Sequence, residues 1–148
     1  MREQVIDLWQ LHEQKKYVCI TVNRFVKRDG NLVMGRGCAK EAKDRYPDIS
    51  KRLGTIYYQN IKEKYAPVIV LPDLRLIAFP VKDHFMNPAK LEIIENSCKE
   101  LMNVIEIRKI KEVYLPRPGC GVGRLDWGRV VKPVISQLLD DRVVVITK

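Results

Sequence analysis

Two short segments of the chain combine closely spaced glycines with an apolar, strand-like run before them and a helical pattern after them. The first contains Gly35 and Gly37, and the second contains Gly119, Gly121 and Gly123. Glycine has no Cβ and tolerates positive φ, so such a loop can turn its backbone N–H groups toward an anion. The N-terminal end of the following helix also favours phosphate. Two such loops suit a diphosphate or dinucleotide-like ligand better than a single phosphate.

Neither glycine segment matches a common nucleotide-binding motif. The P-loop pattern is absent because no Gly-Lys-Ser/Thr follows at the required spacing, and the pair Gly35 and Gly37 lacks the third glycine of the Rossmann fingerprint. An ordinary tight turn is the alternative for each segment, since glycine and proline are common in loops.

The expected secondary structure places both glycine segments between a strand and a helix. Apolar and β-branched runs predict strands at Glu3–Leu8, Tyr17–Val22, Thr55–Gln59, Val68–Leu71, Leu74–Phe79, Lys111–Leu115 and Arg142–Ile146. Helical patterns cover Gly37–Tyr46, Ile49–Leu53, Pro88–Arg108 and Arg129–Leu139. Phe25–Val33 is expected to form a small hairpin around Asp29-Gly30.

This alternation of strands and helices predicts a layered α/β fold with a largely parallel central sheet. In such sheets ligands bind beyond the carboxyl ends of the strands, where both glycine segments lie. The strands at 68–71 and 74–79 are expected to pair around Pro72-Asp73, and Asn87 and Pro88 are expected to begin the long helix.

Composition limits the class of protein. With 148 residues, 46% of them apolar, the chain is expected to form one globular domain at residues 1–148. No apolar stretch is long enough for a membrane span, and the first residues do not open a signal peptide. Four widely spaced cysteines indicate buried free thiols and a cytoplasmic setting, and two histidines make a metal site improbable. The cysteines and histidines are Cys19, Cys38, Cys98, Cys120, His12 and His84.

The net charge of +9 permits partners that carry phosphate, from nucleotides to nucleic acids. The basic residues are spread along the chain and aromatic residues are not interleaved among them, so no nucleic-acid-binding module is indicated. Charge alone supports a nucleic-acid-binding protein, which would show a steep salt dependence of binding.

Four ordered motifs resemble those of the macrodomain family, the ADP-ribose-binding module. They are Asp7-Leu8-Trp9, Thr21-Val22-Asn23, the segment from Val33 to Ala39 and the segment from Pro116 to Trp127. The chain is most similar to the subclass that includes the terminal ADP-ribose protein glycohydrolase and the antitoxins that remove ADP-ribose from DNA. The resemblance implies a three-layer α/β/α arrangement with a mixed, largely parallel sheet.

The resemblance also implies roles for individual residues. Asp7, with Leu8 beside it, would accept a hydrogen bond from the adenine amino group, and Asn23 would face the distal ribose. The two glycine segments would bind the diphosphate. The full set of ADP-ribose-binding residues that the resemblance implies is Asp7, Leu8, Asn23, Met34, Gly35, Arg36, Gly37, Ala39, Pro116, Gly119, Cys120, Gly121, Val122, Gly123 and Arg124.

A catalytic role is implied for Lys82, which falls at the position of a catalytically important lysine in the DNA-directed antitoxins. A lysine beside the anomeric carbon of the distal ribose can form a Schiff-base-type adduct, provided that burial and neighbouring cations lower its pKa. Asn23 and His84 complete the candidate catalytic set, with a packed structural ring as the alternative for His84.

One departure from the family bears on the reaction. Gly123 stands where the terminal ADP-ribose protein glycohydrolase has an acidic residue, which argues against release of ADP-ribose from acidic protein side chains. Asp126, before Trp127, is interpreted as a helix N-cap, with an acid–base role as the alternative.

The expected function is therefore an ADP-ribose-binding hydrolase that acts on a modified macromolecule and needs no cofactor. A phosphatase for ADP-ribose 1″-phosphate and a non-catalytic ADP-ribose-binding module are the alternatives, and Lys82 separates the three. The expected partners are ADP-ribose or an ADP-ribosylated substrate, with nucleic acid as one class of modified substrate. A monomer without membrane contact is expected.

Overall fold

A computed structural model describes all residues from Met1 to Lys148, and a six-stranded sheet forms its centre. The strands are β1 (Arg2–Val5), β2 (Tyr17–Val22), β3 (Ile69–Leu71), β4 (Leu76–Pro80), β5 (Val113–Pro116) and β6 (Val143–Thr147). They lie in the order β1-β6-β5-β2-β4-β3, and all neighbours are parallel except β3 and β4. The predicted mixed, largely parallel sheet is confirmed.

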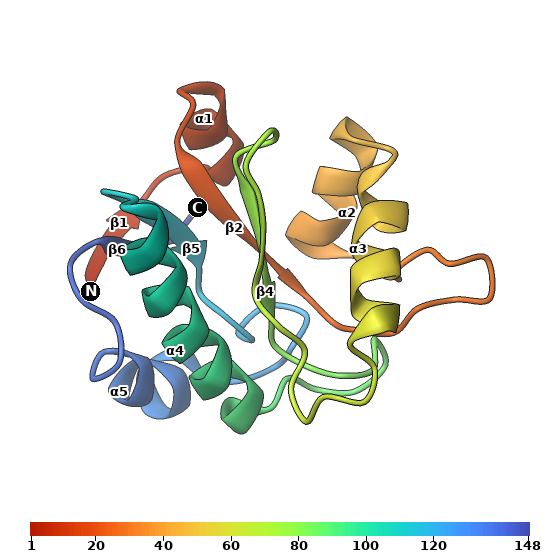
Figure 1. The fold of residues 1–148 in the computed structure, drawn as a ribbon. Coiled ribbons are helices and arrows are strands. Elements are labelled where there is room, and N and C mark those ends of the chain that lie inside the picture. Colours follow the sequence, from red (N-terminus) through yellow and green to blue (C-terminus); the bar gives the residue numbers. More distant parts are fainter.

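Helices cover both faces of this sheet (Figure 1). The helices are α1 (Leu8–Glu13), α2 (Gly37–Arg45), α3 (Ile49–Gln59), α4 (Leu91–Arg108), the π-helical turn η1 (Trp127–Val131) and α5 (Lys132–Ile135). Figure 1 shows α2 and α3 on one side of β2 and β4, and α4 and α5 on the other. The three-layer arrangement is therefore confirmed.

Alternating side chains of the strands build a separate apolar core on each face, as the two-residue period of a strand requires. In β2, Val18 and Ile20 pack toward α1, α2 and α3, whereas Cys19 between them packs toward α4 and α5. Leu101 and Ile105 of α4 are fully buried in the second core. Because both faces of the sheet are covered, the middle strands are fixed and their carboxyl ends become a rigid base for the loops that follow.

The predicted strand at Glu3–Leu8 is wrong in its second half. The strand ends at Val5, and Leu8 begins α1, because Leu8, Trp9 and Leu11 reach one buried face only with helical spacing. Asp7 occupies the N-cap position of α1 without a side-chain capping bond, so its carboxylate is not used by the helix.

The predicted strand at Thr55–Gln59 is also wrong, since these residues complete helix α3. Their β-branched and aromatic composition favours a strand, but Ile49, Leu53 and Tyr57 are buried at helical spacing. Gly54 lies between them, and a Cβ there would come within 2.0 Å of the Gly30 carbonyl oxygen. Tertiary packing against the 25–33 loop therefore decides the helix.

The long helix α4 begins at Leu91 rather than at Pro88, and Asn87 does not cap it. The preceding backbone is held by site loops instead, because Ala89 N–H donates to the Gly123 carbonyl and Lys90 N–H to the Val81 carbonyl. These bonds hold Ala89 and Lys90 against the loops that follow β4 and β5.

The predicted helix at Arg129–Leu139 is replaced by the wide turn η1 and the short α5. Pro133 has no N–H to continue an α-helical ladder, and the Val131 N–H reaches back to the Asp126 carbonyl. The Phe25–Val33 hairpin forms as a loop with a single bridge between Val26 and Leu32.

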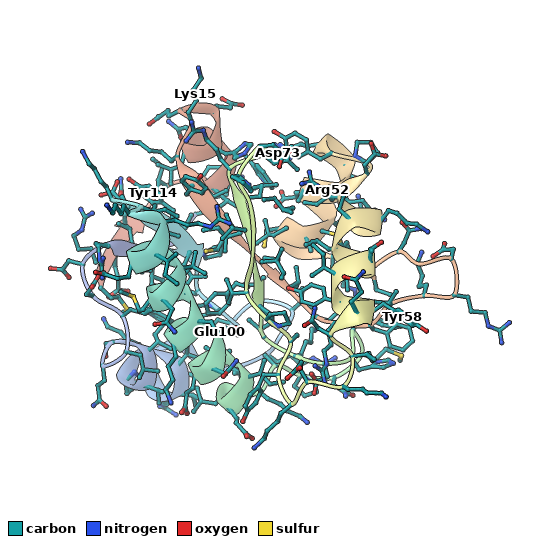
Figure 2. The ribbon with its side chains drawn as sticks, viewed as in Figure 1. Lys15, Arg52, Tyr58, Asp73, Glu100 and Tyr114 are labelled. Carbon is teal, nitrogen blue, oxygen red and sulfur yellow. The ribbon has the colours of Figure 1, made fainter.

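The β3–β4 hairpin pairs as predicted, with Leu71 opposite Leu76 across the Pro72-Asp73 turn. Arg52 of α3 holds this turn through two hydrogen bonds to Asp73, at 2.8 and 3.0 Å (Figure 2). The fold thereby ties α3 to the edge of the sheet farthest from the termini.

No helix of the fold combines the length and the apolar character needed to cross a bilayer. No group of three or more His, Cys, Asp or Glu side chains gathers in an arrangement that could hold a metal ion.

Candidate functional site

A cavity of about 660 Å³ opens at the carboxyl ends of β2, β4 and β5. Four segments enclose it: the end of β2 at 21–23, the loop at 33–39, the loop at 81–87 and the loop at 116–124. Both glycine segments predicted from the sequence therefore face one cavity, as expected for loops that leave the same edge of a parallel sheet.

The cavity forms where β2 and β5 separate. Their ladder contains only the pairs Tyr17 with Val113 and Val18 with Tyr114, at the start of both strands. Farther along, the Thr21 N–H donates to the Cys38 Sγ at 3.4 Å rather than to a β5 carbonyl. A thiol from α2 therefore occupies the place of a ladder partner, and the gap beyond it becomes the floor of the cavity.

The first glycine loop leaves its backbone uncovered at Gly35 and Gly37, two of the residues that line the cavity. Gly37 begins α2 at φ +60°, a region that favours glycine, so the chain can enter the helix with its N–H groups turned toward the cavity. A Cβ at Gly35 would meet no atom within 4 Å. The protein therefore does not need glycine at 35 for its own packing, and the open space at this position is available to a ligand.

In the second loop the three glycines differ in what surrounds them. Gly119 has φ +76°, and a Cβ there would lie 2.7 Å from Ile94 Cδ1; a Cβ at Gly123 would lie 2.6 Å from the Gly119 oxygen. A Cβ at Gly121, in contrast, would meet nothing within 4 Å. Gly119 and Gly123 are thus required by packing, whereas Gly121, like Gly35, leaves free space on the cavity side.

The second loop is fixed at its far end by Asp126. Its carboxylate accepts a hydrogen bond from the Arg129 N–H at 2.7 Å and so caps η1, as the sequence predicted. The Leu125 N–H donates to the Gly119 carbonyl at 2.9 Å, which closes the loop on itself. These two bonds fix the conformation of the second loop.

Lys82 is a buried cation in the wall of the cavity. It follows β4 and is only 8% exposed, and its Nζ donates to the Phe85 carbonyl at a long 3.4 Å. Burial lowers the pKa of Lys82 below the usual lysine range, and the nearby charges of Arg124 and Arg36 lower it further. The uncharged amine, which is the nucleophilic form, is therefore more populated here than on an exposed lysine.

The charges that line the cavity are all positive. Arg36, Lys82, Arg117 and Arg124 face it, and no aspartate or glutamate is among the lining residues. The Arg117 guanidinium is held in place over the Trp127 ring, 5.0 Å from its centroid. Such a cavity favours an anion and offers no carboxylate for acid–base chemistry.

Comparison with known proteins places this geometry in a family. No protein-family model matches the sequence. A DNA ADP-ribosyl glycohydrolase of Mycobacterium tuberculosis is 32% identical over 115 residues, which cover 70% of this chain and 31% of that protein. The macrodomain of Mycobacterium tuberculosis DarG is 27% identical with a TM-score of 0.78, and the match covers 99% of this chain and 97% of that one. The chain belongs to the macrodomain family.

A third relative shares the macrodomain fold. Thermosipho africanus DarTG, solved in complex with ADP-ribose, matches with a TM-score of 0.77 and 21% identity over 99% of this chain and 41% of that one. The macrodomain described here spans about a third of the length of the curated relatives that it matches, 31% for the two mycobacterial proteins.

Most residues expected to bind ADP-ribose line the cavity of this macrodomain. These are Asn23, Met34, Gly35, Arg36, Gly37, Ala39, Pro116, Gly119, Gly121, Val122, Gly123 and Arg124, together with the candidate catalytic Lys82. Asp7, Leu8 and Cys120 line a second hollow of about 610 Å³ instead. The two hollows share Cys38, Pro116, Arg117 and Gly121, so they adjoin one another.

Two of the candidate catalytic residues have structural partners. The Asn23 side chain donates to the Val33 carbonyl at 3.0 Å and accepts from the Phe25 N–H at 2.8 Å, so both ends of its amide hold backbone. His84 does not line the cavity; its ring stacks on Phe85 with centroids 4.5 Å apart.

The sequence reading missed several lining residues of this macrodomain. Arg117 and Cys38 lie inside the quoted motifs, and the available signal was the position of Arg117 between two prolines and of Cys38 directly after Gly37. Phe85, Met86 and Asn87 carry no motif of their own; only their proximity to Lys82 in sequence indicated them.

Proposed function

We propose that this macrodomain binds ADP-ribose and hydrolyses its bond to a base of modified DNA. The names of the related proteins, DNA ADP-ribosyl glycohydrolases, support the substrate. The observation that carries the reaction is a buried lysine of lowered pKa in a cavity with no carboxylate. An uncharged amine at this position can act as a nucleophile toward the anomeric carbon of the ribose.

In this proposal the ligand spans both hollows. The N–H groups at 35–37 and 121–123 and the N-terminus of α2 receive the diphosphate, which Arg36, Arg117 and Arg124 attract. Asp7, in the adjoining hollow, accepts from the adenine amino group, and the distal ribose extends toward Asn23 and Lys82. Preorganised donors of this kind lose little freedom when the ligand binds.

The proposed reaction begins with the uncharged Lys82 amine. Its Nζ attacks C1″ of the distal ribose, the bond from C1″ to the base breaks, and the base takes the electron pair and the proton that Nζ releases. The lysine–ribose adduct opens to a Schiff base, to which water adds at the same carbon. Cleavage of the C1″–Nζ bond then releases ADP-ribose and restores the amine, so that one water is consumed.

The surroundings of Gly123 and Asp126 bear on the substrate preference. Gly123 is confined by the Gly119 oxygen at 2.6 Å from any added Cβ, so an acidic side chain does not fit at this position without a backbone shift. Asp126 lines the second hollow and caps η1, and it is not among the residues that line the cavity of Lys82. These observations support a DNA base rather than a protein carboxylate as the leaving group.

The test is hydrolysis of an ADP-ribosylated single-stranded oligonucleotide, measured by release of ADP-ribose. Lys82→Ala is expected to lower kcat/KM at least about 10²-fold, the contribution typical of a group acting directly at the reacting atoms. Lys99→Ala, an exposed lysine on α4, is the matched control and is expected to behave like the wild type. Borohydride is expected to trap a covalent adduct with the wild type and not with Lys82→Ala.

Other outcomes assign other functions. ADP-ribose binding without release from any modified oligonucleotide indicates a binding module, and release of phosphate from ADP-ribose 1″-phosphate in both Lys82→Ala and the wild type indicates a phosphatase. Full activity of Lys82→Ala on the oligonucleotide would contradict the proposed mechanism.

The setting belongs to the proposal as well. Four free cysteines, two of them fully buried, support a reducing compartment such as the cytoplasm. We propose that residues 1–148 act as one monomeric macrodomain, which light scattering with size-exclusion chromatography tests.

A further inference from the structure

Three aromatic rings gather beside the mouth of the cavity, and the proposed reaction at Lys82 does not use them. Phe25 follows β2, whereas His84 and Phe85 follow β4. The Phe25 ring lies 4.7 Å from His84 and 5.3 Å from Phe85, centroid to centroid, and His84 stacks on Phe85. We call these three residues the ring cluster.

The two phenylalanines of the ring cluster are open to solvent although they are large and apolar, and His84 between them is half-buried. Phe25 is 38% exposed and Phe85 39%, and the neighbouring Met86 is 71% exposed. Phe85 and Met86 also line the cavity. The exposed apolar surface therefore continues from the cavity wall to the outside of the protein, where a group that leaves the cavity would meet it.

The ring cluster is held by bonds from the candidate site residues. The Phe25 N–H donates to Asn23 Oδ1 at 2.8 Å, and the Phe85 carbonyl accepts from Lys82 Nζ at 3.4 Å. His84 Nδ1 accepts from the Met86 N–H at 3.1 Å, which fixes the imidazole beside both phenyl rings. The rings are thus positioned relative to the amine that reacts.

The surroundings of the ring cluster are basic. Arg36, Lys82, Arg117 and Arg124 line the adjoining cavity. On the outer side, Arg24 donates to the Glu63 carbonyl at 2.9 Å, which brings the segment carrying Lys62 alongside, whereas Lys64 in the same segment is paired with Glu92 at 3.7 Å. Asp83 is paired with Arg24 at 3.1 Å, so its carboxylate is neutralised locally. Exposed rings beside unpaired cations match the bases and phosphates of a single nucleic-acid strand.

We propose that Phe25, His84 and Phe85 form a stacking platform for bases of single-stranded DNA whose modified base points into the cavity. This inference rests on the proposed function, because that function supplies DNA as the substrate. Bases inside a duplex present no free face to a ring, so the platform selects a strand whose bases are already unpaired. The sequence gives no hint of it, since Phe25 and Phe85 are 60 positions apart and meet only through the parallel pairing of β2 and β4.

The test measures binding of a fluorescein-labelled, unmodified 12-nucleotide oligothymidylate by anisotropy at low salt, with ADP-ribose present at saturation. Phe25→Leu and Phe85→Leu keep apolar volume but remove the π-face, and each is expected to weaken binding roughly fivefold or more. Tyr17→Leu is the matched control, because Tyr17 lies at the opposite end of β2 and contacts Arg75 instead. A duplex of the same length is expected to bind more weakly than the single strand.

Equal affinity of the wild type and both phenylalanine variants, or equal affinity for single strand and duplex, would overturn the platform and leave attraction by charge alone. An acidic peptide that competes as well as the oligonucleotide would do the same. Affinity of Phe25→Leu for ADP-ribose, measured by calorimetry, is expected to equal that of the wild type, since Phe25 does not line the cavity.

Hydrolysis of the ADP-ribosylated oligonucleotide separates the two proposals. If the wild type releases no ADP-ribose but the phenylalanine variants still weaken binding of the single strand, the platform stands and the proposed reaction fails. If hydrolysis depends on Lys82 while binding does not depend on the rings, the reaction stands and the platform fails.

Discussion

At the scale of single residues, the site depends on the lowered pKa of Lys82. Lysine is charged in water, but Lys82 is buried in the loop that follows β4, where a charge is poorly solvated. Arg124 and Arg36 act in the same direction by repulsion. The cavity therefore draws in an anionic ligand and activates an amine with one set of charges.

The pH dependence of the reaction follows from this arrangement. Because the pKa of Lys82 is lowered, kcat/KM is expected to rise with pH along a limb that lies below the usual lysine range. Arg36→Gln removes a repelling charge, so the pKa of Lys82 rises and the limb moves to higher pH. Rate profiles of both proteins measure the midpoint independently of any loss in affinity.

The control for this shift is Arg129→Gln, which changes the net charge equally but lies in η1, outside the cavity lining. An unchanged midpoint in Arg36→Gln, or the same shift in the control, would show that Lys82 does not report the charge beside it.

Gly119 and Gly121 are two positions apart, but Gly119 is required by packing whereas Gly121 leaves space for a ligand. Gly119→Ala forces a side chain into positive φ and against Ile94, so unfolding is expected to become easier by about 1–3 kcal/mol. Gly121→Ala meets nothing, so stability is expected to stay within about 0.5 kcal/mol of the wild type. Its methyl group occupies ligand space instead, and the Kd for ADP-ribose is expected to rise at least roughly tenfold.

Denaturant unfolding and calorimetry on the same two variants decide this. Should Gly121→Ala bind ADP-ribose as tightly as the wild type, the second loop would not approach the diphosphate as proposed.

At the scale of elements, the fold brings together the loops that form the site. Helix α4 begins three residues late because the preceding backbone bonds to Gly123 and Val81, and this brings the loop after β4 against the loop after β5. The site is thus a junction of strand ends and extended segments rather than of helices. The N-terminus of α2 lines the main cavity, and the N-termini of α1 and η1 line the adjoining hollow.

The difference between prediction and structure has a physical cause at this scale. The apolar runs of β2, β4, β5 and β6 are strong enough to predict strands locally, and the positions of both glycine loops follow from β2 and β5. The start of α1 and the end of α3 were misread because Glu3–Leu8 and Thr55–Gln59 are stretches whose composition favours strands, while the packing that decides their structure is distant in sequence.

The site was only partly predictable for a similar reason. The roles of Gly35 and Gly121 could be predicted from the glycine motifs. The division of the lining residues between two adjoining hollows could not, and neither could the hydrogen bonds of the Asn23 amide to Val33 and Phe25. Pairs of residues brought together by parallel strands leave no spacing that a sequence pattern can reveal.

At the scale of the whole molecule, an apolar core packs on each face of the sheet, while its two middle strands, β2 and β5, separate toward their carboxyl ends. The cores contain side chains from every strand except β1, whose residues are all exposed. The division lies between β2 and β5, past Val18 and Tyr114. The rigid parts of the molecule therefore surround the place where the sheet is least bonded.

The sulfur at this division makes the centre of the sheet observable in solution. Thr21 donates to Cys38 Sγ, a weak acceptor, whereas Val81 donates to the Val22 carbonyl at 2.9 Å. In amide hydrogen exchange, Thr21 is expected to exchange faster than Val81, despite lying in the middle of the sheet. ADP-ribose bound across the gap would slow amide exchange at Thr21 as well as in the glycine loops. Exchange at an amide in the centre of the fold therefore reports whether the cavity at its surface is occupied.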